Sequence, residues 1–528
     1  MGLIFIKISN DNILSTYPDT LMEQLEIKEE ISGGIFFQYV NSIALVLAGF
    51  IFYIYIIHFY SSELVGTVAL LLAITSLLNI FFSLGLGYGL QHYISYQMGR
   101  KEYGKIREMI TKFLLIGLSL GILSLLALYL SSPIFAMLFL HTFKYILLVK
   151  YLGIDLFFMV LSTFLSGILI GLQNFKSQAL WNIVGIFITY SLPVVLLSIF
   201  NNSIFIIVGW AAGYALSSIA YLLIIMRRVK QMAASEGSVK VSQVFSYAFP
   251  IFLASLIGYG ASYVDRFVVS YLLNLSLLGI YNFALLISSA LGFIVAPFAT
   301  ILLPKLSEKY GLQKKDEIRN YVAKGIELLS TIYVPVAMLV AALSSSILLF
   351  LSSSTYLPAS IPVMIVLVVS SLFVSGNILS VSLQGIRKTR IFLITSSLAL
   401  LSNFILSILL IPRYQMIGAS IGYSSITVVS FFIMYYYARK FEILKFELAK
   451  IAKIYVSGFV MFFVILALQS MFSYSPLKLL VYIVLGFAIY SGMIKVLRTF
   501  SKEDLDFIML LIPWWLQKAR VVISTLFL

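Results

Sequence analysis

Residues 64–94 read LVGTVALLLAITSLLNIFFSLGLGYGLQHYI and contain no Asp, Glu, Lys or Arg. About 20 apolar residues form a helix long enough to cross the hydrocarbon core of a bilayer, which is roughly 30 Å thick. The rest of the chain has the same character, since 61% of its 528 residues are hydrophobic, 11% are charged, and the mean hydropathy is +1.04. Soluble domains carry about 25% charged residues. The composition therefore excludes an ordinary water-soluble protein and predicts an all-α polytopic membrane protein.

Working outward from this stretch, apolar segments bounded by charged or turn residues give about 14 transmembrane helices. The predicted spans are residues 35–58, 64–94, 109–130, 150–172, 179–200, 203–226, 243–272, 277–303, 325–351, 361–384, 391–410, 414–437, 451–471 and 477–495. An even number of spans places both termini on the same side of the membrane.

The distribution of positive charge predicts which side that is. If the N-terminus lies inside, the inner segments hold 30 of the 36 Lys and Arg residues, and two more, Lys112 and Arg266, fall within spans. The outer segments hold only Lys144, Lys150, Arg413 and Lys478. Since cytoplasmic loops carry an excess of Lys and Arg, we expect a multi-pass protein of the cell membrane with both termini in the cytoplasm. The net charge of +15 then reflects topology and contact with anionic lipid, and nucleic acid is not an expected partner.

Internal repetition divides the chain into two halves. Leu64-Val65-Gly66 matches Leu277-Leu278-Gly279, Leu172 to Lys176 matches Leu383 to Arg387, and Gly209 to Tyr214 matches Gly418 to Tyr423, at offsets of 213, 211 and 209. Six spans per half is an even number, so the halves are predicted to be parallel repeats about an axis along the membrane normal, followed by two C-terminal helices. The pairs Gly209/Gly213 and Gly418/Gly422 are expected to allow close helix packing within each half.

The predicted organisation follows from the spans and the repeat. It comprises a cytoplasmic N-terminal tail (1–34), an N-terminal six-helix bundle (35–226), a cytoplasmic linker (227–242), a C-terminal six-helix bundle (243–438), transmembrane helices 13 and 14 (439–497), and a cytoplasmic or interfacial C-terminal segment (498–528).

Several stretches resemble a known family in the order in which they occur. They are LVGTVALLLAITSLLNIFFSLGLGYGLQHYISYQMGRKE (64–102), FPIFLASLIGYGASYVDRFVVSYLL (249–273), LLGIYNFA (277–284), ILLPKLSE (301–308) and LQGIRKTR (383–390) with LSNFILSILLIPRYQMIGASIGY (401–423). Together they resemble polysaccharide-export flippases of the O-antigen and teichoic-acid type, in the superfamily that also holds multidrug and toxin extrusion proteins.

This resemblance implies a function. The chain would be a flippase, not an enzyme, that moves polyprenyl-(di)phosphate-linked sugars or oligosaccharides from the cytoplasmic to the outer leaflet by alternating access, for assembly of cell-surface polysaccharide or glycoconjugates. The partners expected on this basis are membrane lipids, the lipid-linked saccharide substrate and cell-surface glycan assembly enzymes, and the protein is expected to be a monomer.

Ionisable residues at membrane depth are costly, so each is a candidate functional residue. Arg266 is the one deep basic residue, and its planar fork of donors suits a phosphate group lying between the two repeats. Its neighbour Asp265 is a second candidate, with a structural ion pair or hydrogen bond as an equal alternative. Asp155 is predicted at a depth similar to that of Arg266, roughly 7–10 Å below the outer boundary at 1.5 Å per residue, and could form an ion pair or gate with it.

Uncharged polar residues in the spans are candidate sugar contacts, because amide and aromatic side chains can bind hydroxyl groups. The candidates are Gln38, Asn41, Asn79, Tyr263 and Asn282. For any one of them, hydrogen bonding between helices is the more frequent role. No cofactor and no metal site is expected, since the chain has no cysteine and its three histidines lack metal-ligand spacing.

Two alternatives remain open at this stage. One is a multidrug or metabolite exporter of the same superfamily, for which an acidic cavity would be expected. The other is a membrane-embedded polysaccharide polymerase or glycosyltransferase. Such enzymes need acidic catalytic residues in an outer loop, whereas the longest predicted outer loop, residues 131–149, contains no Asp or Glu.

Overall fold

The computed structural model describes residues 40–232, 240–445, 447–472 and 474–499. The predicted tail 1–34, Gln38, much of the linker 227–242 and nearly all of the segment 498–528 lie outside these residues. Among the described residues, thirteen helices are long and apolar enough to cross a membrane. The chain is therefore a polytopic membrane protein, in agreement with the composition.

The helices of the first half succeed one another through short connections. After the helix Val40–Phe59 come α2 (Ser62–Ser83), α3 (Leu86–Gly99), α4 (Tyr103–Leu140), the 3₁₀ turn η3 (Phe143–Tyr145), α5 (Ile146–Gly171), α6 (Phe175–Phe200) and α7 (Ile204–Lys230).

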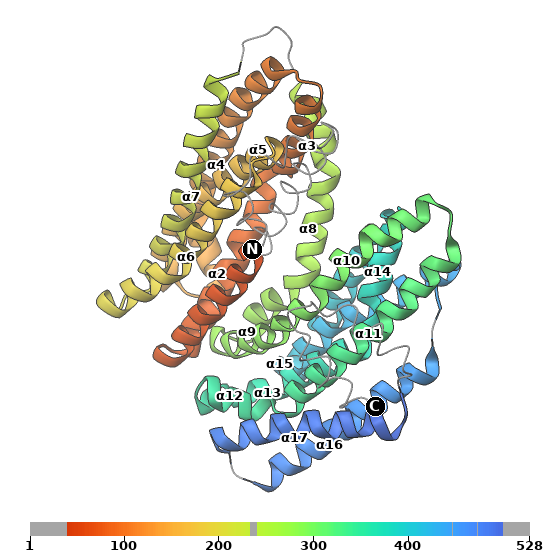
Figure 1. The fold of residues 1–528 in the computed structure, drawn as a ribbon. Coiled ribbons are helices and arrows are strands. Elements are labelled where there is room, and N and C mark those ends of the chain that lie inside the picture. Colours follow the sequence, from red (N-terminus) through yellow and green to blue (C-terminus); the bar gives the residue numbers. More distant parts are fainter. Residues whose placement is uncertain (1–39, 233–239, 446, 473, 500–528) are drawn as a thin grey trace, which may run out of the picture. The chain divides into compact units, whose positions relative to one another are not determined.

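The second half of the chain begins with α8, and two long C-terminal helices follow that half. These elements are α8 (Val241–Leu272), α9 (Leu275–Ala290), α10 (Gly292–Gly311), α11 (Lys315–Ala342), α12 (Ser344–Leu351), η4 (Ser354–Ala359), α13 (Ser360–Leu372), α14 (Ser375–Gly385), α15 (Arg390–Lys440), α16 (Leu448–Met471) and α17 (Pro476–Val496) (Figure 1).

The helix α15 contains two of the predicted spans. Its 51 residues are interrupted at Gln415, whose φ of 49° and ψ of −126° are not helical. The predicted spans 391–410 and 414–437 therefore correspond to the two parts of α15. With α15 counted as two, thirteen helices agree with fourteen spans.

Four predicted spans are interrupted where the sequence suggests continuous helices, and one of them is 325–351, which is divided at Leu343 between α11 and α12. The stretch 64–94 is divided between α2 and α3 at Leu84 and Gly85, which both have positive φ. Gly85 tolerates this left-handed conformation because it lacks a β-carbon. The span 277–303 is divided at Leu291 between α9 and α10, and the span 361–384 is divided at Phe373 and Val374 between α13 and α14. An unbroken run of apolar residues does not reveal such breaks, because hydropathy is the same on both sides of them.

The described residues form two compact units. Unit 1 comprises the described residues of 1–49, 82–125 and 154–248, and unit 2 those of 50–81, 126–153 and 249–528. Unit 2 therefore contains the second half of the chain from Phe249 onward, the two C-terminal helices, and the parts of the first half that are predicted to lie toward the outer side. Each unit is described by itself below.

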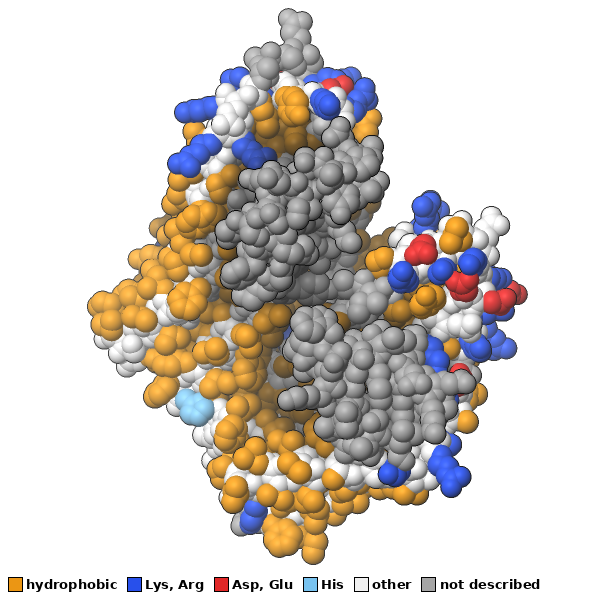
Figure 2. Space-filling model, viewed as in Figure 1, with side chains coloured by type: hydrophobic (Ala, Val, Ile, Leu, Met, Phe, Trp, Pro, Cys, Tyr) orange, Lys and Arg blue, Asp and Glu red, His pale blue; other side chains and the backbone are white. Residues whose placement is uncertain are grey.

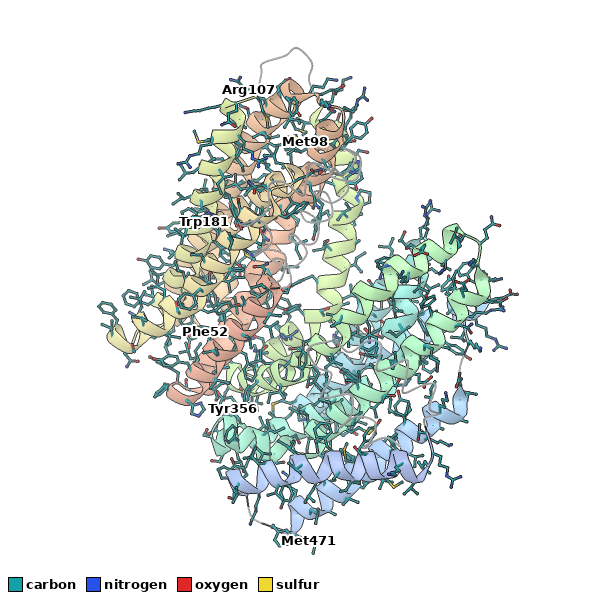
Figure 3. The ribbon with its side chains drawn as sticks, viewed as in Figure 1. Phe52, Met98, Arg107, Trp181, Tyr356 and Met471 are labelled. Carbon is teal, nitrogen blue, oxygen red and sulfur yellow. The ribbon has the colours of Figure 1, made fainter. Side chains whose placement is uncertain are left out.

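Charged side chains mark the predicted cytoplasmic end of unit 1. Figure 2 shows Lys and Arg side chains gathered where α3 and α4 meet, and this end carries Arg100, Lys101, Lys105 and Arg107. Arg107, labelled with Met98 in Figure 3, donates a hydrogen bond from Nη1 to the carbonyl oxygen of Met232 at 3.2 Å. The beginning of α4 is thereby joined to the segment that follows α7.

In unit 2 the helices α16 and α17 lie together and pack on α11 (Figure 1). Gly458 and Gly486 allow this close packing, because a β-carbon at either would touch Val334 or Leu339 of α11 at less than 3 Å. An ionic contact joins the same helices, since Glu327 of α11 lies 3.6 Å from Lys450 of α16. Figure 3 labels Tyr356 and Met471 at the end of unit 2 opposite to the connection between α10 and α11. Helices 13 and 14 are thus attached to the second half of the chain.

Unit 2 contains a reciprocal contact between matching positions of the two halves. Ser62 of α2 and Ser276 of α9 lie 2.6 Å apart through their hydroxyl oxygens. A β-carbon built on Gly66 would lie 2.8 Å from the amide nitrogen of Gly279, and one built on Gly279 would lie 2.8 Å from that of Gly66. A contact in which i meets j and j meets i is typical of a two-fold axis. The repeat match of Gly66 with Gly279 therefore has a local two-fold counterpart in the structure.

The two halves also share the hydrogen bonds that begin and end corresponding helices. The Ser61 and Asn274 side chains accept from the amides of Leu64 and Leu277, each three residues ahead. After α5, the amides of residues 172, 173 and 174 donate to the carbonyls of 168, 170 and 169, and after α14 those of 386, 387 and 388 donate to 382, 384 and 383. The ends of α5 and α14 therefore correspond at an offset of 214, whereas the sequence match of Leu172 to Lys176 with Leu383 to Arg387 has an offset of 211. Superposition of the complete halves remains a prediction.

The Gly-x-x-x-Gly pairs pack within their own halves, as expected. A β-carbon on Gly209 or Gly213 would overlap Pro193 or Thr189 of α6. In the second half, a β-carbon on Gly418 or Gly422 would lie 2.5 Å from Leu410 or Ser407, which belong to the preceding part of α15.

Candidate functional site

Asp265 of α8 lies at the centre of a hydrogen-bonded cluster in unit 2. The hydroxyl of Tyr281 on α9 donates to Oδ2 at 2.6 Å, and Nδ2 of Asn403 on α15 lies 3.3 Å from Oδ1. Nδ2 of Asn403 also donates to the carbonyl of Ala261 at 2.9 Å, and Oδ1 of Asn403 accepts from Ser407 at 3.0 Å. Asp265, Tyr281, Asn403 and Ser407 are all fully buried. We call these four residues the carboxylate cluster.

The cluster joins three helices through groups that have mutual partners. A buried carboxylate needs hydrogen bonds that replace those of water, and here Tyr281 and Asn403 provide them. This arrangement favours the structural alternative for Asp265, because its oxygens are directed into the protein.

Arg266 follows Asp265 in the chain but has a different environment. Successive residues of a helix point about 100° apart, so its side chain leaves the carboxylate cluster. Nη1 donates to the carbonyl of Ser262 at 2.7 Å, and Nε donates to Oδ1 of Asn282 at 3.2 Å. The guanidinium carbon also lies 4.2 Å from the ring centre of Tyr263, within the range of a cation–π interaction.

These contacts hold the guanidinium without neutralising it. Among the described residues of unit 2, no carboxylate lies within 4.0 Å of its nitrogens, and the side chain is partly exposed. An arginine has five N–H donors, and two described hydrogen bonds leave donors free. The tyrosine beneath it is itself fixed, since Tyr263 stacks on Tyr259 with 4.2 Å between ring centres, and Tyr259 donates to the carbonyl of Ala73 on α2 at 2.9 Å. The geometry is that of a positioned cation able to accept an anionic ligand.

The other predicted site residues divide between the two units. Asn282, Tyr263 and Asn79 belong to unit 2, and the first two contact Arg266 directly. Asn41 belongs to unit 1, where its Oδ1 accepts a hydrogen bond from Nδ2 of Asn182 at 2.9 Å. This bond is the interhelical role that was the alternative to sugar contact. Gln38 lies outside the described residues.

Asp155 lies in α5 of unit 1 and is 1% exposed. Its Oδ1 has no hydrogen-bond partner among the described residues, and Tyr214 is near it. Asp155 and Arg266 belong to different units, so their pairing remains a prediction.

A cavity of about 650 Å³ lies within the second half of the chain, inside unit 2. We call it the hydroxyl chamber, because Ser and Thr side chains of α9, α13, α14 and α15 line it. Tyr423, which lines the chamber, is close enough to Arg266 and Asp265 to interact with both electrostatically. The chamber and the guanidinium are therefore neighbouring features. Among the described residues, no group of three or more His, Asp or Glu side chains could hold a metal ion.

Sequence reasoning identified Arg266, Asp265, Asn282 and Tyr263 but not the other members of the site. Tyr281 and Asn403 occur in the family-like stretches, and their polarity in spans 8 and 11 was the signal that could have linked them to Asp265. The chamber had no comparable signal, because a serine in an apolar helix usually bonds to its own backbone.

Two family models match this chain. The family described as polysaccharide biosynthesis protein matches residues 33–309, and the MatE family matches residues 250–409.

Individual proteins are similar over different parts of the chain. An uncharacterized membrane protein of Methanocaldococcus jannaschii is 28% identical over 52% of this chain, and the chain spans about half (54%) of its length. A probable low-salt glycan biosynthesis flippase of Haloferax volcanii is 21% identical over 47% of this chain and 53% of its own. The solved structure of the lipid II flippase MurJ, in an inward closed conformation, is 18% identical over 88% of this chain and 98% of its own, with a TM-score of 0.70. The protein thus shares the fold of this flippase.

Proposed function

The chain belongs to the polysaccharide biosynthesis protein family, and on that premise we propose that it is a flippase for saccharides linked to a polyprenyl phosphate or diphosphate. It would move the saccharide from the cytoplasmic to the outer leaflet of the cell membrane and supply cell-surface polysaccharide or glycoconjugate assembly. The observation that carries this proposal is the partly exposed guanidinium of Arg266, which is held by neutral groups and has no carboxylate within ion-pair distance among the described residues of unit 2.

The substrate has a part that matches this guanidinium. A phosphate or diphosphate offers several acceptor oxygens and negative charge, which arginine binds with two parallel N–H donors. Asn282 and the carbonyl of Ser262 orient the guanidinium before the substrate arrives, and Tyr263 supports its face. Preorganisation of this kind reduces the entropy lost on binding. Arg266 would therefore bind the phosphate while the polyprenyl chain remains in the bilayer.

Alternating access would require the contacts on the predicted outer side of unit 2 to separate. Ser62 meets Ser276 there, and Ser270 donates to the carbonyl of Phe139 at 2.6 Å and accepts from His141 through its carbonyl at 3.1 Å. These are a few neutral hydrogen bonds, each worth about 1 kcal/mol. Such a closure can open at a cost that substrate binding can offset.

The match of the MatE family to residues 250–409 supports a second candidate, an exporter of drugs or metabolites. Binding of amphipathic cations would need an exposed carboxylate. In the second half of unit 2, Asp265 is buried and bonded to Tyr281 and Asn403, so the described site favours an anionic substrate instead.

Reconstitution of the purified protein into liposomes with a fluorescent polyprenyl-diphosphate saccharide tests the proposal. Wild-type protein should transfer the lipid between leaflets, Arg266→Ala should abolish transfer, and Arg266→Lys should reduce it strongly because the bidentate fork is lost. Arg439→Lys, an exposed position at the end of α15, serves as the matched control. Normal transfer by Arg266→Ala, or recovery in the double variant Arg266→Ala with Asp155→Ala, would show that Arg266 is a structural ion-pair member.

The direction of transport depends on topology, which labelling can test separately. The chain has no cysteine, so single cysteines can be introduced without background. A cysteine at Ser235, in the predicted cytoplasmic linker, should resist an impermeant reagent in sealed cells and react after permeabilisation. Labelling in sealed cells would reverse the proposed orientation.

A further inference from the structure

The hydroxyl chamber is a cavity of one unit, formed by α9 and α10, α11, α13 and α14, and α15. Its volume of about 650 Å³ lies within the range of about 300–1,000 Å³ that small-molecule sites occupy. Two helix interruptions border it, since Gly292 follows the break between α9 and α10, and Phe373 lies in the break between α13 and α14. Helix interruptions at membrane depth are tolerated where they line a cavity.

The lining of the chamber combines many hydroxyl groups with no charge. No Asp, Glu, Lys, Arg or His is among the lining residues. Five of the Ser and Thr side chains form no hydrogen bond with another described residue, namely Ser380, Ser396, Ser424, Thr427 and Ser430. Ser424 is the most enclosed of them, because it is 4% exposed and its Oγ is buried without a partner.

Other serines on the same helix have partners. Ser402, Ser420 and Ser425 of α15 donate to backbone carbonyls three residues earlier, at 2.9, 2.8 and 2.6 Å. This is the usual solution for a hydroxyl in an apolar helix, since burial of an unpaired hydroxyl costs about 1–3 kcal/mol in protein mutational data. The five chamber hydroxyls do not use this solution, so their hydrogen-bonding capacity is available to a molecule within the chamber.

Aromatic rings supply the apolar part of the lining. Phe373 and Phe431 lie with ring centres 5.1 Å apart, and Phe392 and Tyr423 also line the cavity. A molecule that matches this lining has hydroxyl groups that both donate and accept, carbon–hydrogen faces that pack on rings, and no charge, because a charge without a partner would be destabilised there. A neutral sugar ring has all three properties, whereas a uronic acid or an amino sugar has a charge.

We propose that the hydroxyl chamber binds neutral sugar units of the transported lipid-linked saccharide, while Arg266 binds the phosphate next to them. This inference rests on the proposed function, and Tyr423 is its structural link, since this residue lines the chamber and interacts with Arg266. The chamber then binds the saccharide and distinguishes one saccharide from another, and the guanidinium binds the phosphate or diphosphate that all polyprenyl-linked substrates share. Selectivity for neutral over charged sugars would reside in the second half of the chain.

Binding measurements with two probes separate the chamber from the phosphate site. The probes are undecaprenyl diphosphate carrying a disaccharide of neutral hexoses and undecaprenyl diphosphate without sugar, titrated against the full chain in phospholipid nanodiscs. Wild-type protein should bind the sugar-bearing probe more tightly. The double variant Thr427→Val with Ser430→Ala nearly keeps side-chain volume and removes two hydroxyls. Its affinity for the sugar-bearing probe should therefore be lower by roughly tenfold or more, and its affinity for the sugar-free probe should be unchanged. Ser425→Ala, whose hydroxyl bonds to its own helix, should change neither.

The outcomes distinguish this inference from the proposed function. Equal affinity of the wild type for both probes, or an unchanged preference in the double variant, overturns the chamber as a sugar site. Arg266→Ala should lower the affinity for both probes alike. If it lowers neither, Arg266 does not bind the phosphate, while the preference for the sugar-bearing probe can still be measured. A third probe that carries a uronic acid should bind no better than the sugar-free lipid, and tight binding of it would contradict the neutral-sugar specificity.

Discussion

The carboxylate cluster and the hydroxyl chamber are two polar regions of unit 2 that share the helices α9 and α15, and their hydrogen bonds differ. In the cluster, each of the four side chains has a hydrogen-bond partner in the protein at 2.6–3.3 Å. In the chamber, five Ser and Thr hydroxyls have no partner among the described residues. Polar groups in a membrane protein are costly in both places, but the protein itself offsets the cost only in the cluster.

This difference separates structural polarity from polarity that is available for a ligand. Asp265 is a charged residue in an apolar span and was therefore a candidate binding residue, yet its hydrogen bonds join α8, α9 and α15 and stabilise the fold. Ser424 and Thr427 carry no charge, yet they face a cavity with donors and acceptors free. The state of the hydrogen bonds is therefore a better guide to binding residues here than charge alone.

The largest effect is expected from breaking the carboxylate cluster. Asp265→Ala would remove the carboxylate that accepts from Tyr281 and Asn403 and leave them only the carbonyls of Ala419 and Ala261, at a cost of roughly 2–5 kcal/mol. Asp265→Asn keeps the size and one acceptor, so it should be less harmful, and Arg266→Ala should leave folding nearly intact. Thermal unfolding in nanodiscs, followed by tryptophan fluorescence, measures this order. A variant Asp265→Ala as stable as the wild type would mean that the cluster does not support the fold.

The second prediction compares a packed glycine with a glycine at the chamber. A β-carbon on Gly279 would overlap the carbonyl of Ser62, whereas one on Gly292 meets no atom within 4 Å. Gly279→Ala should destabilise the protein by roughly 1–3 kcal/mol, because the backbones of α2 and α9 must move apart. Gly292→Ala should change stability by about 0.5 kcal/mol or less. Equal unfolding temperatures of the two variants would show that the reciprocal contact is not tight.

The sequence predicted most of the fold because long apolar runs and the distribution of Lys and Arg are strong signals. Breaks within those runs were missed, since Phe373 and Leu291 look like any other apolar residue in a span. The break at Gly85 has a local signal, the glycine-rich LGLGYG, but hydropathy does not reveal it because the run around it is continuously apolar.

The site was predictable in part for a related reason. Arg266 and Asp265 stood out as charges in apolar spans, but the sequence could not show that one has buried partners and the other does not. Partners such as Asn403 lie 138 residues away from Asp265, and only the folded chain brings them together. The chamber depends on which hydroxyls bond to their own helix, a property of side-chain direction that composition does not contain.

The same substitution at two positions of α15 should have opposite effects. Ser407→Ala removes the donor to Asn403 Oδ1 and should destabilise the protein by about 1 kcal/mol. Ser424→Ala removes a buried hydroxyl that has no partner and should stabilise the empty protein by about 1 kcal/mol, while it weakens binding of the sugar-bearing probe. Both changes are measured as shifts of the unfolding temperature. Destabilisation by both would indicate that Ser424 has a structural bond and would remove the contrast between the two regions.

The smallest effect is expected outside the membrane spans, where water can replace lost partners. Glu442 follows α15 and pairs with Lys315 and, at 3.7 Å, with Arg319. The hydrogen bond from Lys315, with the positive charge of Lys315 and Arg319, lowers the pKa of the Glu442 carboxyl. A carboxyl whose pKa is lowered by folding contributes stability above its unfolded pKa of about 4.3, and this contribution is lost as the pH falls through the folded pKa. The unfolding temperatures of wild type and Glu442→Gln should therefore differ slightly at pH 7 and converge near pH 3. A difference that persists at low pH would show that the carboxylate charge is not its source. Packing and hydrogen bonding would then determine the contribution of this exposed group, as they do in the buried carboxylate cluster.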